Sequence, residues 1–448
     1  MDVVMLSRLQ FAITIGFHYL YPPLSIGLGV ALVIMEATYL RTKNVVYLNM
    51  TKFWARIFGL IFAIGVATGI VMEFEFGTNW AAYSRFVGDV FGSALAAEGV
   101  FAFFLESGFL AILLFGWDKV KPGLHFFATV MVMIGAHFSA LWIIVANSWM
   151  QTPAGYHLVQ TATGVRAEIT DFWAMVFNPS SLDRLSHTIM GAWQAGAFFV
   201  ISVGAFYLLK RRHEQIAKAS IRIGLVVAVA GSLLQLLTGD FSAKMVARHQ
   251  PAKLAAFEGI YEDGQSAPMT ILGWVDESRE RVIGIQIPGM LSWLVHGDSK
   301  APITGLHAFK VEDRPPVNVV FQTYHGMVAI GMALILLAVG GLILVWRKKL
   351  FENRVLLWIY VFSVLLPQIA NQLGWASAEI GRQPWLVYNL MRTSEGVSRT
   401  VGAGQILGSL ILFTIIYVGL FVLFIYLLDD KIRKGPEETG LVEEGHRA

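Results

Sequence analysis

The sequence contains no cysteine among its 448 residues. Cysteine thiolates hold iron–sulfur clusters and blue-copper-type centres, and a c-type haem is attached covalently through cysteine. The side chains of this protein therefore cannot hold any of these three redox centres. A fold stabilised by disulfide bonds is excluded for the same reason.

Charged residues are also scarce. They make up 15% of the chain, whereas soluble domains carry roughly 25%. Hydrophobic residues make up 56%, and the mean hydropathy is +0.60. This composition excludes an intrinsically disordered protein and a nucleic-acid-binding domain. The net charge of +3 is too small to indicate a partner.

What the chain has in abundance is long apolar runs. Each is long enough to cross a hydrocarbon core of roughly 30 Å at about 1.5 Å per residue. The sequence therefore predicts an all-α fold, a polytopic membrane bundle of about nine transmembrane helices. The runs lie approximately at 10–37, 53–72, 91–116, 124–148, 185–209, 219–239, 319–346, 353–374 and 402–428.

Basic residues cluster in alternate connections between these runs and in the tail. By the positive-inside rule those segments are cytoplasmic, which predicts an N-terminus outside and a C-terminus in the cytoplasm. An odd number of helices requires the same opposite placement. The basic residues are Arg41, Lys43, Lys119, Lys121, Arg211, Arg212, Lys218, Arg347, Lys348, Lys349, Arg354, Lys431, Arg433 and Lys434.

The chain divides into four segments on this basis. Residues 1–239 hold helices one to six, and residues 319–428 hold helices seven to nine. Between them, residues 240–318 form a long polar loop on the outer face, and loops of this length in compact proteins are usually functional. Residues 429–448 are predicted to form a cytoplasmic tail.

Ionisable residues inside membrane spans are costly, so each is a functional candidate. His18 lies in the first run, His187 opens the fifth, and Met327 lies in the seventh at a depth comparable to His187. Histidine with a thioether is the axial ligand pair of a low-spin, electron-transferring haem. The alternatives are a hydrogen-bonded core histidine and a methionine that only fills space.

Two carboxylates occupy the third run. Glu98 and Glu106 are eight residues apart, which is about 12 Å along a regular helix. Carboxylates so arranged can relay protons through a bundle, although each can instead bond to a neighbouring helix. Ser107 and Ser139 are weaker candidates for the same relay.

Near the end of the eighth run, Trp375, Glu379 and Arg382 follow at i, i+4 and i+7, on one face of a continued helix. A carboxylate flanked by an aromatic ring and a cation can ligate a metal or hold a haem propionate. Alternatively, Glu379 and Arg382 form an ordinary ion pair at a helix end.

Several longer stretches together resemble subunit I of the cytochrome bd family, bacterial quinol oxidases that lack copper. They cover spans one to four, the start of the long loop and the end of span eight. The stretches are LSRLQF (6–11) followed by His18, TKFWARIFG (51–59), GVATGIVMEFEFGTNW (65–80), EGVFAFFLES (98–107), FGWD (115–118), ALWIIVANSWMQ (140–151), QPAKLAAFEG (250–259) and GWASAEIGRQPW (374–385).

The resemblance implies three haems near the outer face: two haem b, one low-spin and one high-spin, and one haem d or a third haem b. His187 and Met327 match the ligands of the low-spin haem b. His18 and Glu379 match the ligands of the two high-spin haems, and the resemblance leaves open which position holds which haem.

It also implies roles for the other candidates. Trp375 matches an aromatic residue close to the high-spin haems, and Arg382 a residue near a propionate. Glu98 matches a carboxylate beside the high-spin pair, and Glu106 a residue of a proton path from the cytoplasm.

Lys253 and Glu258 match loop residues implicated in quinol oxidation. The loop that follows is short, as in the short-loop and cyanide-insensitive branches of the family. Many members carry an arginine two residues before the methionine ligand, where this chain has His325. On a regular helix His325 is about 200° from Met327, so it is not expected to replace the methionine as ligand.

The resemblance thus predicts a multi-pass protein of the bacterial cytoplasmic membrane. It would oxidise quinol outside, reduce O₂ to water with cytoplasmic protons, and build a proton motive force without pumping. The expected partners are a multi-span subunit II and a small single-span subunit. A secondary transporter with intramembrane carboxylates is the alternative from another class, and a structural subunit without redox centres is a third.

Overall fold

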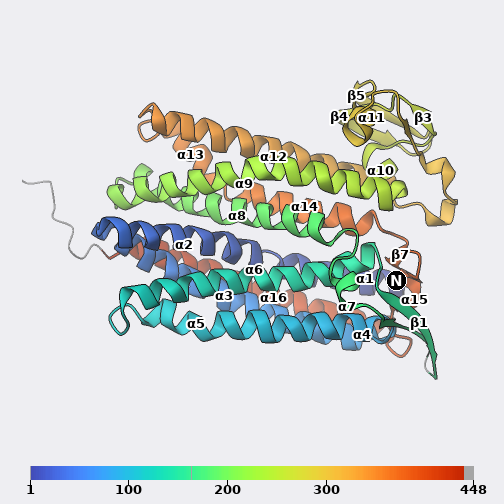
Figure 1. Ribbon diagram of the computed structural model, residues 1–448, viewed down its shortest axis with the longest axis horizontal. Helices are drawn as coiled ribbons and strands as arrows, with labels where there is room; N and C mark the ends of the chain where they lie inside the picture. Colours follow the sequence, from blue (N-terminus) through green and yellow to red (C-terminus); the bar gives the residue numbers. More distant parts are fainter. Residues whose placement is uncertain (1, 163, 438–448) are drawn as a thin grey trace, which may run out of the picture.

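The computed structural model describes residues 2–162 and 164–437. It is an elongated bundle of long helices that carries a small β-rich segment beside one end (Figure 1). Within the described residues, nine helical segments are long and apolar enough to cross a membrane. This confirms the predicted all-α bundle and the number of its spans.

The nine spans are built from twelve α-helices and one π-helical segment. They are α1 (Val3–His18) with α2 (Pro22–Thr42), α3 (Val45–Thr78), α4 (Ala81–Glu98) with η1 (Gly99–Phe103) and α5 (Phe104–Phe115), α6 (Pro122–Gln151), α8 (Ser181–Leu209), α9 (Glu214–His249), α12 (Val317–Trp346), α13 (Arg354–Phe362) with α14 (Leu365–Ile380), and α16 (Ala403–Lys434).

The remaining elements are short and lie between spans. Four are helices: α7 (Phe172–Val176), α10 (Pro251–Glu258), α11 (Met290–His296) and α15 (Thr393–Gly396). Two are 3₁₀ turns, η2 (Leu306–Ala308) and η3 (Val311–Asp313). The strands form four antiparallel pairs: β1 (Tyr156–Thr161) with β2 (Gly164–Ile169), β3 (Gly264–Gln265) with β6 (Pro302–Ile303), β4 (Met269–Asp276) with β5 (Arg281–Ile287), and β7 (Trp385–Val387) with β8 (Met391–Arg392).

Three of the predicted runs are not single regular helices. The run 10–37 breaks after His18, and α2 starts at Pro22, where the missing N–H of proline costs no helical hydrogen bond. The run 353–374 breaks between α13 and α14, and Pro367 falls in the first turn of α14 for the same reason. The run 91–116 contains the π-helical segment η1. Hydropathy alone did not reveal these breaks, because the residues at each break are as apolar as their neighbours.

The long loop starts later than predicted. Helix α9 continues to His249 instead of ending at 239. Its polar last turns stay helical because Lys244 pairs with Asp240 one turn earlier, at 2.6 Å. The predicted tail is likewise shorter, since α16 runs to Lys434. Residues 438–448 of that tail lie outside the described residues.

Helix α8 lies at the centre of the bundle and contacts α2 almost backbone to backbone. A Cβ atom added to Gly196 would lie 2.2 Å from the carbonyl carbon of Gly27, and one added to Gly27 would lie 2.2 Å from the carbonyl oxygen of Ala192. Small residues permit such close helix approach in membranes. This contact fixes the helix that carries His187.

The two ends of the bundle are distinct. The N-terminus lies at the end that also carries α10 (Figure 1). At the other end Arg212, after α8, donates to the carbonyl oxygen of Arg433 in α16 at 2.9 Å. The chain therefore starts and finishes its membrane crossings at opposite ends, as an odd number of spans requires.

Candidate functional site

One large cavity, with a volume of about 1550 Å³, runs between the helices. Ten of the residues that the sequence singled out as candidates line it, although these ten come from seven helices and the segment after α14. They are His18, Glu98, Glu106, His187, Lys253, Glu258, Met327, Trp375, Glu379 and Arg382.

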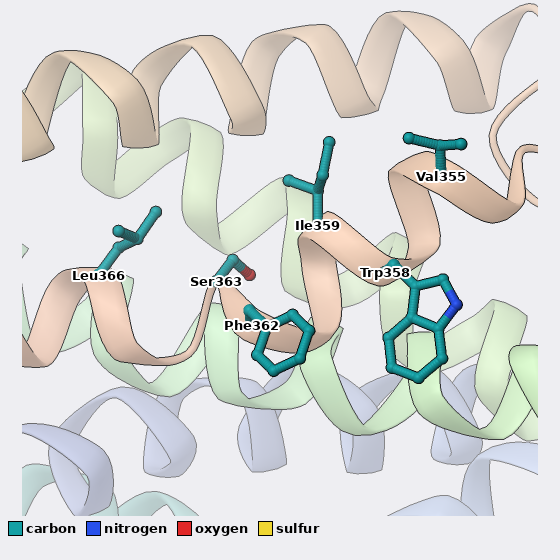
Figure 2. Close-up of a pocket in the computed structure, with 6 residues that line it drawn as sticks. All are labelled: Val355, Trp358, Ile359, Phe362, Ser363 and Leu366. Carbon is teal, nitrogen blue, oxygen red and sulfur yellow. The ribbon is translucent and has the colours of Figure 1, made fainter.

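A second hollow lies on α13, and its lining differs in chemical character from that of the large cavity (Figure 2). Its lining is apolar apart from Ser363, whose hydroxyl already donates to the carbonyl oxygen of Tyr360 at 2.8 Å. It contains no ionisable side chain, so it offers no acid, base or metal ligand. The large cavity is the candidate site.

His187 projects from the start of α8 toward α9. The amide nitrogen of Gln235 lies 3.0 Å from each ring nitrogen, and the Thr238 hydroxyl lies 3.4 Å from Nδ1. One amide hydrogen bond engages only one ring nitrogen well, so the other is available as a ligand. Gly239 leaves room beside the ring, since an added Cβ would lie 3.5 Å from Cε1.

Met327 is placed by a close approach of α12 to α14. A Cβ atom added to Gly374 would lie 2.7 Å from the Met327 sulfur, so the thioether packs directly against this glycine. The Met327 side chain also lines the cavity.

His18 ends α1 and faces α3. Its Nδ1 lies 2.9 Å from the Thr68 hydroxyl, which lies 2.9 Å from the Ile64 carbonyl oxygen. If Thr68 donates to that carbonyl, it accepts the proton of Nδ1, and Nε2 is left with a free lone pair. This orientation by an outer hydrogen bond is typical of histidines that ligate metals. Gly69 leaves space at the ring edge.

Glu379, at the end of α14, is held by three neighbours. One carboxylate oxygen accepts from the Asn147 amide at 3.1 Å and the Gln151 amide at 3.2 Å, both on α6, and the other pairs with Arg382. The ion pair anticipated from the sequence is therefore present. It does not exclude a ligand role, because the carboxylate also lines the cavity.

Cations outnumber carboxylates around Glu379. The Lys253 ammonium donates to the side-chain oxygens of Gln151 and Gln250, and Arg184 donates to Asn147. Burial, together with nearby Arg184 and Arg382, lowers the pKa of Lys253 well below its usual value. Three basic side chains, two of them guanidinium groups, thus lie around one carboxylate, which is costly unless a further anion is bound.

Arg382 points to that anion most directly. The residue is 3% exposed, and its Nε and Nη1 atoms have no hydrogen-bond partner among the described residues. Buried donors without partners are rare in native proteins, which suggests an absent ligand. A haem propionate is a carboxylate that would satisfy them. Gly69 and Gly239 leave space beside the rings of His18 and His187. These two histidines, together with the unpartnered donors of Arg382, fit haem.

Glu258 and Lys253 lie on the same short helix, α10, but point to different partners. They are five residues apart, or about 140° around the helix. Glu258 is 4% exposed and accepts from the backbone N–H of Thr270 at 3.3 Å. Burial raises its pKa to about 7, which is suitable for a group that gains and loses protons near neutral pH.

His325 occupies the position where many family members carry arginine. Its Nδ1 lies 2.9 Å from the carbonyl oxygen of Phe321 and its Nε2 lies 2.9 Å from that of Thr270. Both ring nitrogens are engaged by the protein. This agrees with the expectation that His325 does not replace Met327 as a ligand.

The two carboxylates of the third span lie in a less polar part of the cavity. Glu98 accepts from the Ser139 hydroxyl at 2.9 Å, and Glu106 is buried against Gly135, where an added Cβ would lie 2.8 Å from the Glu106 Cβ. Neither carboxylate pairs with a cation among the residues described. Either can therefore be protonated without leaving a buried cation unpaired.

The regular-helix spacing assumed for this pair is wrong. Segment η1 lies between Glu98 and Glu106, so the chain from one to the other does not follow a regular α-helix. Ser107 does not extend the relay, because its exposed hydroxyl donates to the backbone oxygen of Phe103 at 2.6 Å. Ser139, by contrast, does contact Glu98.

The sequence reasoning missed several polar residues of this region. Arg184 lies three residues before His187 and was not singled out, because it falls just outside the predicted run 185–209, where a charge is ordinary. Asn147 and Gln151 gave no signal, because neutral amides are common. Glu75 falls after the predicted run 53–72, yet it lies within α3, is 2% exposed, and accepts a hydrogen bond from the Thr14 hydroxyl at 2.5 Å.

Fold and site together define a multi-pass membrane protein whose central cavity collects histidine, methionine and carboxylate side chains beside an excess of buried cations. The family described as cytochrome bd terminal oxidase subunit I matches residues 6–436. The chain belongs to this haem-containing family and is a terminal oxidase subunit, as its sequence motifs predicted.

Comparison with individual proteins supports the same family assignment. The chain is 40% identical to cytochrome bd ubiquinol oxidase subunit 1 of Bacillus subtilis, over 98% of this chain and 95% of the relative. It is 35% identical to cytochrome bd-II ubiquinol oxidase subunit 1 of Escherichia coli, over 97% of each. The solved bd oxidase from Geobacillus thermodenitrificans superposes with a TM-score of 0.91 at 29% identity, covering 97% of this chain and 99% of that one.

Proposed function

We propose that the chain is the haem-carrying subunit of a bacterial quinol oxidase. It oxidises membrane quinol at the outer face and takes protons for O₂ reduction from the cytoplasm, so that charge is separated without a pump. The carrying observation is that ten residues chosen from sequence alone line one cavity. The relatives from Bacillus subtilis and Escherichia coli are named ubiquinol oxidases, which supports quinol as the substrate class.

His187 and Met327 would hold a low-spin haem b, and His18 and Glu379 the two high-spin haems, one haem b and one haem d or a third haem b. When bound, haem iron supplies one-electron transfer and oxygen chemistry that no side chain of the chain provides. The packing of Met327 against Gly374 and the contact between His18 and Thr68 support the ligand roles of Met327 and His18.

Arg382 would hold a haem propionate, with Arg184 beside it. The two unpartnered nitrogens of Arg382 support this assignment. Trp375 lines the same part of the cavity, two turns after Pro367 in α14, and would pack against a haem plane. In this arrangement Glu379 keeps the cations oriented through Asn147 and Gln151.

Glu258 would act as the base for quinol. A carboxylate accepts a proton from a quinol hydroxyl, and the pKa of about 7 makes it effective near neutral pH. Lys253, on another face of α10, would stabilise the developing negative charge on the quinol oxygen from the side of Glu379. Both residues lie at the bundle end that carries the N-terminus, which the positive-inside rule assigns to the outer face (Figure 1).

Glu106 and Glu98 would carry protons from the cytoplasmic side. Glu106 lies deeper in the third span than Glu98 relative to the N-terminal end, so protons from the opposite end meet it first. The hydroxyl of Ser139 holds the Glu98 carboxylate at 2.9 Å and can pass a proton to or from it. Uptake at one end and release from Glu258 at the other separate charge across the bilayer.

The complex would lie in the bacterial cytoplasmic membrane with further subunits. The relatives are named subunit 1, which implies at least one more chain. We propose a multi-span subunit II and a small single-span subunit. Exposed apolar side chains along α16, such as Ile415 at 65%, leave room for protein or lipid on this side.

The test is His187→Ala in the purified complex, examined by reduced-minus-oxidised visible spectroscopy. The low-spin haem band should disappear while the high-spin signals remain, because only one of the proposed ligand sets is broken. An unchanged spectrum would show that His187 is not an axial ligand. Gln194→Ala, on the same helix and also lining the cavity, is the matched control and should keep all bands.

A further inference from the structure

The hairpin of β4 and β5 has two faces of different character. Its register pairs Val275 with Val282, and both pack inward. A Cβ added to Gly259, just after α10, would lie 2.6 Å from Val282 and 3.0 Å from Val275. This inner face therefore rests on the loop core that also contains α10.

The outer face is apolar and uncovered. Leu272 pairs with Ile285 and Trp274 pairs with Ile283. All four side chains are largely exposed: Leu272 at 69%, Ile285 at 63%, Trp274 at 58% and Ile283 at 53%. The charged residues of the hairpin are confined to its turn, 276–281. An apolar patch bounded by charge marks an interaction site rather than a surface made for water.

The hairpin is fixed to one particular face of α12. The Val275 N–H donates to the Asn318 side-chain oxygen at 3.4 Å, and the Gln322 amide donates to the Gly273 carbonyl oxygen at 2.9 Å. Figure 1 shows β4 and β5 at the side of the bundle, beside the end of α12 where α10 lies, rather than beyond the helix ends.

That face of α12 continues as a membrane-facing surface. Leu336 follows Asn318 by eighteen residues, which is five helical turns, and so lies directly below it. Leu336 is 73% exposed, and Ile343, about 20° from the same line, is 44% exposed. The hairpin thus lies at the end of an exposed apolar row of α12.

We propose that the outer face of the β4–β5 hairpin lies in the lipid–water interface of the leaflet on the α10 side of the bundle. Leu272, Ile283 and Ile285 would insert among the upper acyl segments. Trp274 would lie at the headgroup level, where indole rings are enriched in membrane proteins. The occupant is lipid because the patch continues the lipid-facing row of α12 and the turn carries both signs of charge, Arg279 and Arg281 with Asp276 and Glu280.

One consequence follows for Glu258, and it rests on the proposed function. The inner face of the hairpin supplies the Thr270 N–H that binds the Glu258 carboxylate. A hairpin held in the interface would keep that base at the depth where a membrane-dissolved quinol arrives. The lipid placement itself does not depend on quinol chemistry.

The absence of cysteine makes a direct test possible. Ile283→Cys and, separately, Leu272→Cys are labelled with a nitroxide in the intact complex, reconstituted in phosphatidylcholine nanodiscs. Collision rates with O₂, which concentrates in lipid, and with a water-soluble nickel chelate are measured by electron paramagnetic resonance. Ser278→Cys, in the exposed turn, is the aqueous control, and a chain-labelled lipid is the membrane reference.

Both hairpin labels should resemble the labelled lipid, with O₂ collisions several-fold favoured over the chelate, while the Ser278→Cys label shows the reverse. Labels that behave like Ser278→Cys would place the patch in water and overturn the proposal. Labels shielded from both reagents would show that a protein subunit covers the patch, which also overturns it. Activity with quinol is recorded in parallel, so that a failed quinol assignment is distinguished from a failed lipid placement.

Discussion

The cavity contains two regions that differ in charge. Around Glu379, three basic side chains surround one carboxylate, and Arg382 still has two nitrogens without partners among the described residues. Around Glu98 and Glu106, carboxylates lie without any cation in contact among the residues described. The first arrangement is suited to holding anionic groups permanently, whereas the second is suited to carboxylates that change protonation. One cavity can therefore bind a cofactor at one place and conduct protons at another.

The largest effect is expected from Glu379→Gln. The change removes a proposed haem ligand, which is also the only carboxylate in contact with Arg382 among the described residues. O₂ uptake should fall at least about 100-fold, with quinol and with an artificial electron donor alike. Loss of one high-spin haem should be visible in the spectrum. Retention of full haem content and activity would remove Glu379 from the ligand set.

Glu258→Gln should lower quinol-dependent O₂ uptake roughly 100-fold, the usual order for loss of a general base. An artificial donor that bypasses the loop should still support uptake. Equal losses with both donors would show that Glu258 does not serve the quinol site.

The pH profile sharpens this prediction. Burial raises the pKa of Glu258 to about 7, and the active form is the deprotonated carboxylate. The quinol-dependent rate should therefore rise as pH increases through about 7, and this rise should be absent in Glu258→Gln. A rise that persists in the variant would assign the titration to another group.

Arg382→Gln should weaken haem retention by about tenfold, since outer contacts of a metal site commonly contribute 10–100-fold in affinity. Haem content per chain after detergent purification measures this. Arg166→Gln is the matched control, because Arg166 is exposed and pairs only with Glu168 on a surface strand pair. Equal haem content in the two variants would contradict the propionate assignment.

The smallest effect is expected from Ser139→Ala, which removes the hydroxyl that contacts Glu98. A single hydrogen bond contributes about 1 kcal/mol, so O₂ reduction should slow about fivefold. Ser107→Ala should have no effect, because that hydroxyl bonds only to its own helix. Stopped-flow oxidation of the reduced complex compares the two. A similar loss in both variants would remove Ser139 from the proton path.

The residues of the cavity differ in how well the sequence predicts them. His187, Glu98 and Glu106 could be identified because an ionisable side chain within an apolar run is unusual. Met327 was identified by its depth, which is comparable to that of His187, and by the resemblance to the family. The number of spans followed from length and hydropathy alone. Arg184 was missed because it lies at a span boundary, where a charge is ordinary.

Contacts between distant segments could not be predicted. The Lys253–Gln151–Glu379 chain of hydrogen bonds joins α10, α6 and α14, and nothing in the spacing of these residues indicates it. The π-helical segment η1 has the same apolar composition as a regular helix. The extension of α9 depends on the Asp240–Lys244 pair, which a hydropathy profile scores only as polar.

The central claim is that this cavity holds haem through the side chains of this chain. The most direct measurement is the reduced-minus-oxidised visible spectrum of the purified complex, combined with a count of haem per chain. The account predicts a strong Soret band and three haems for each copy of this chain. A pure, intact complex without haem absorbance would contradict it.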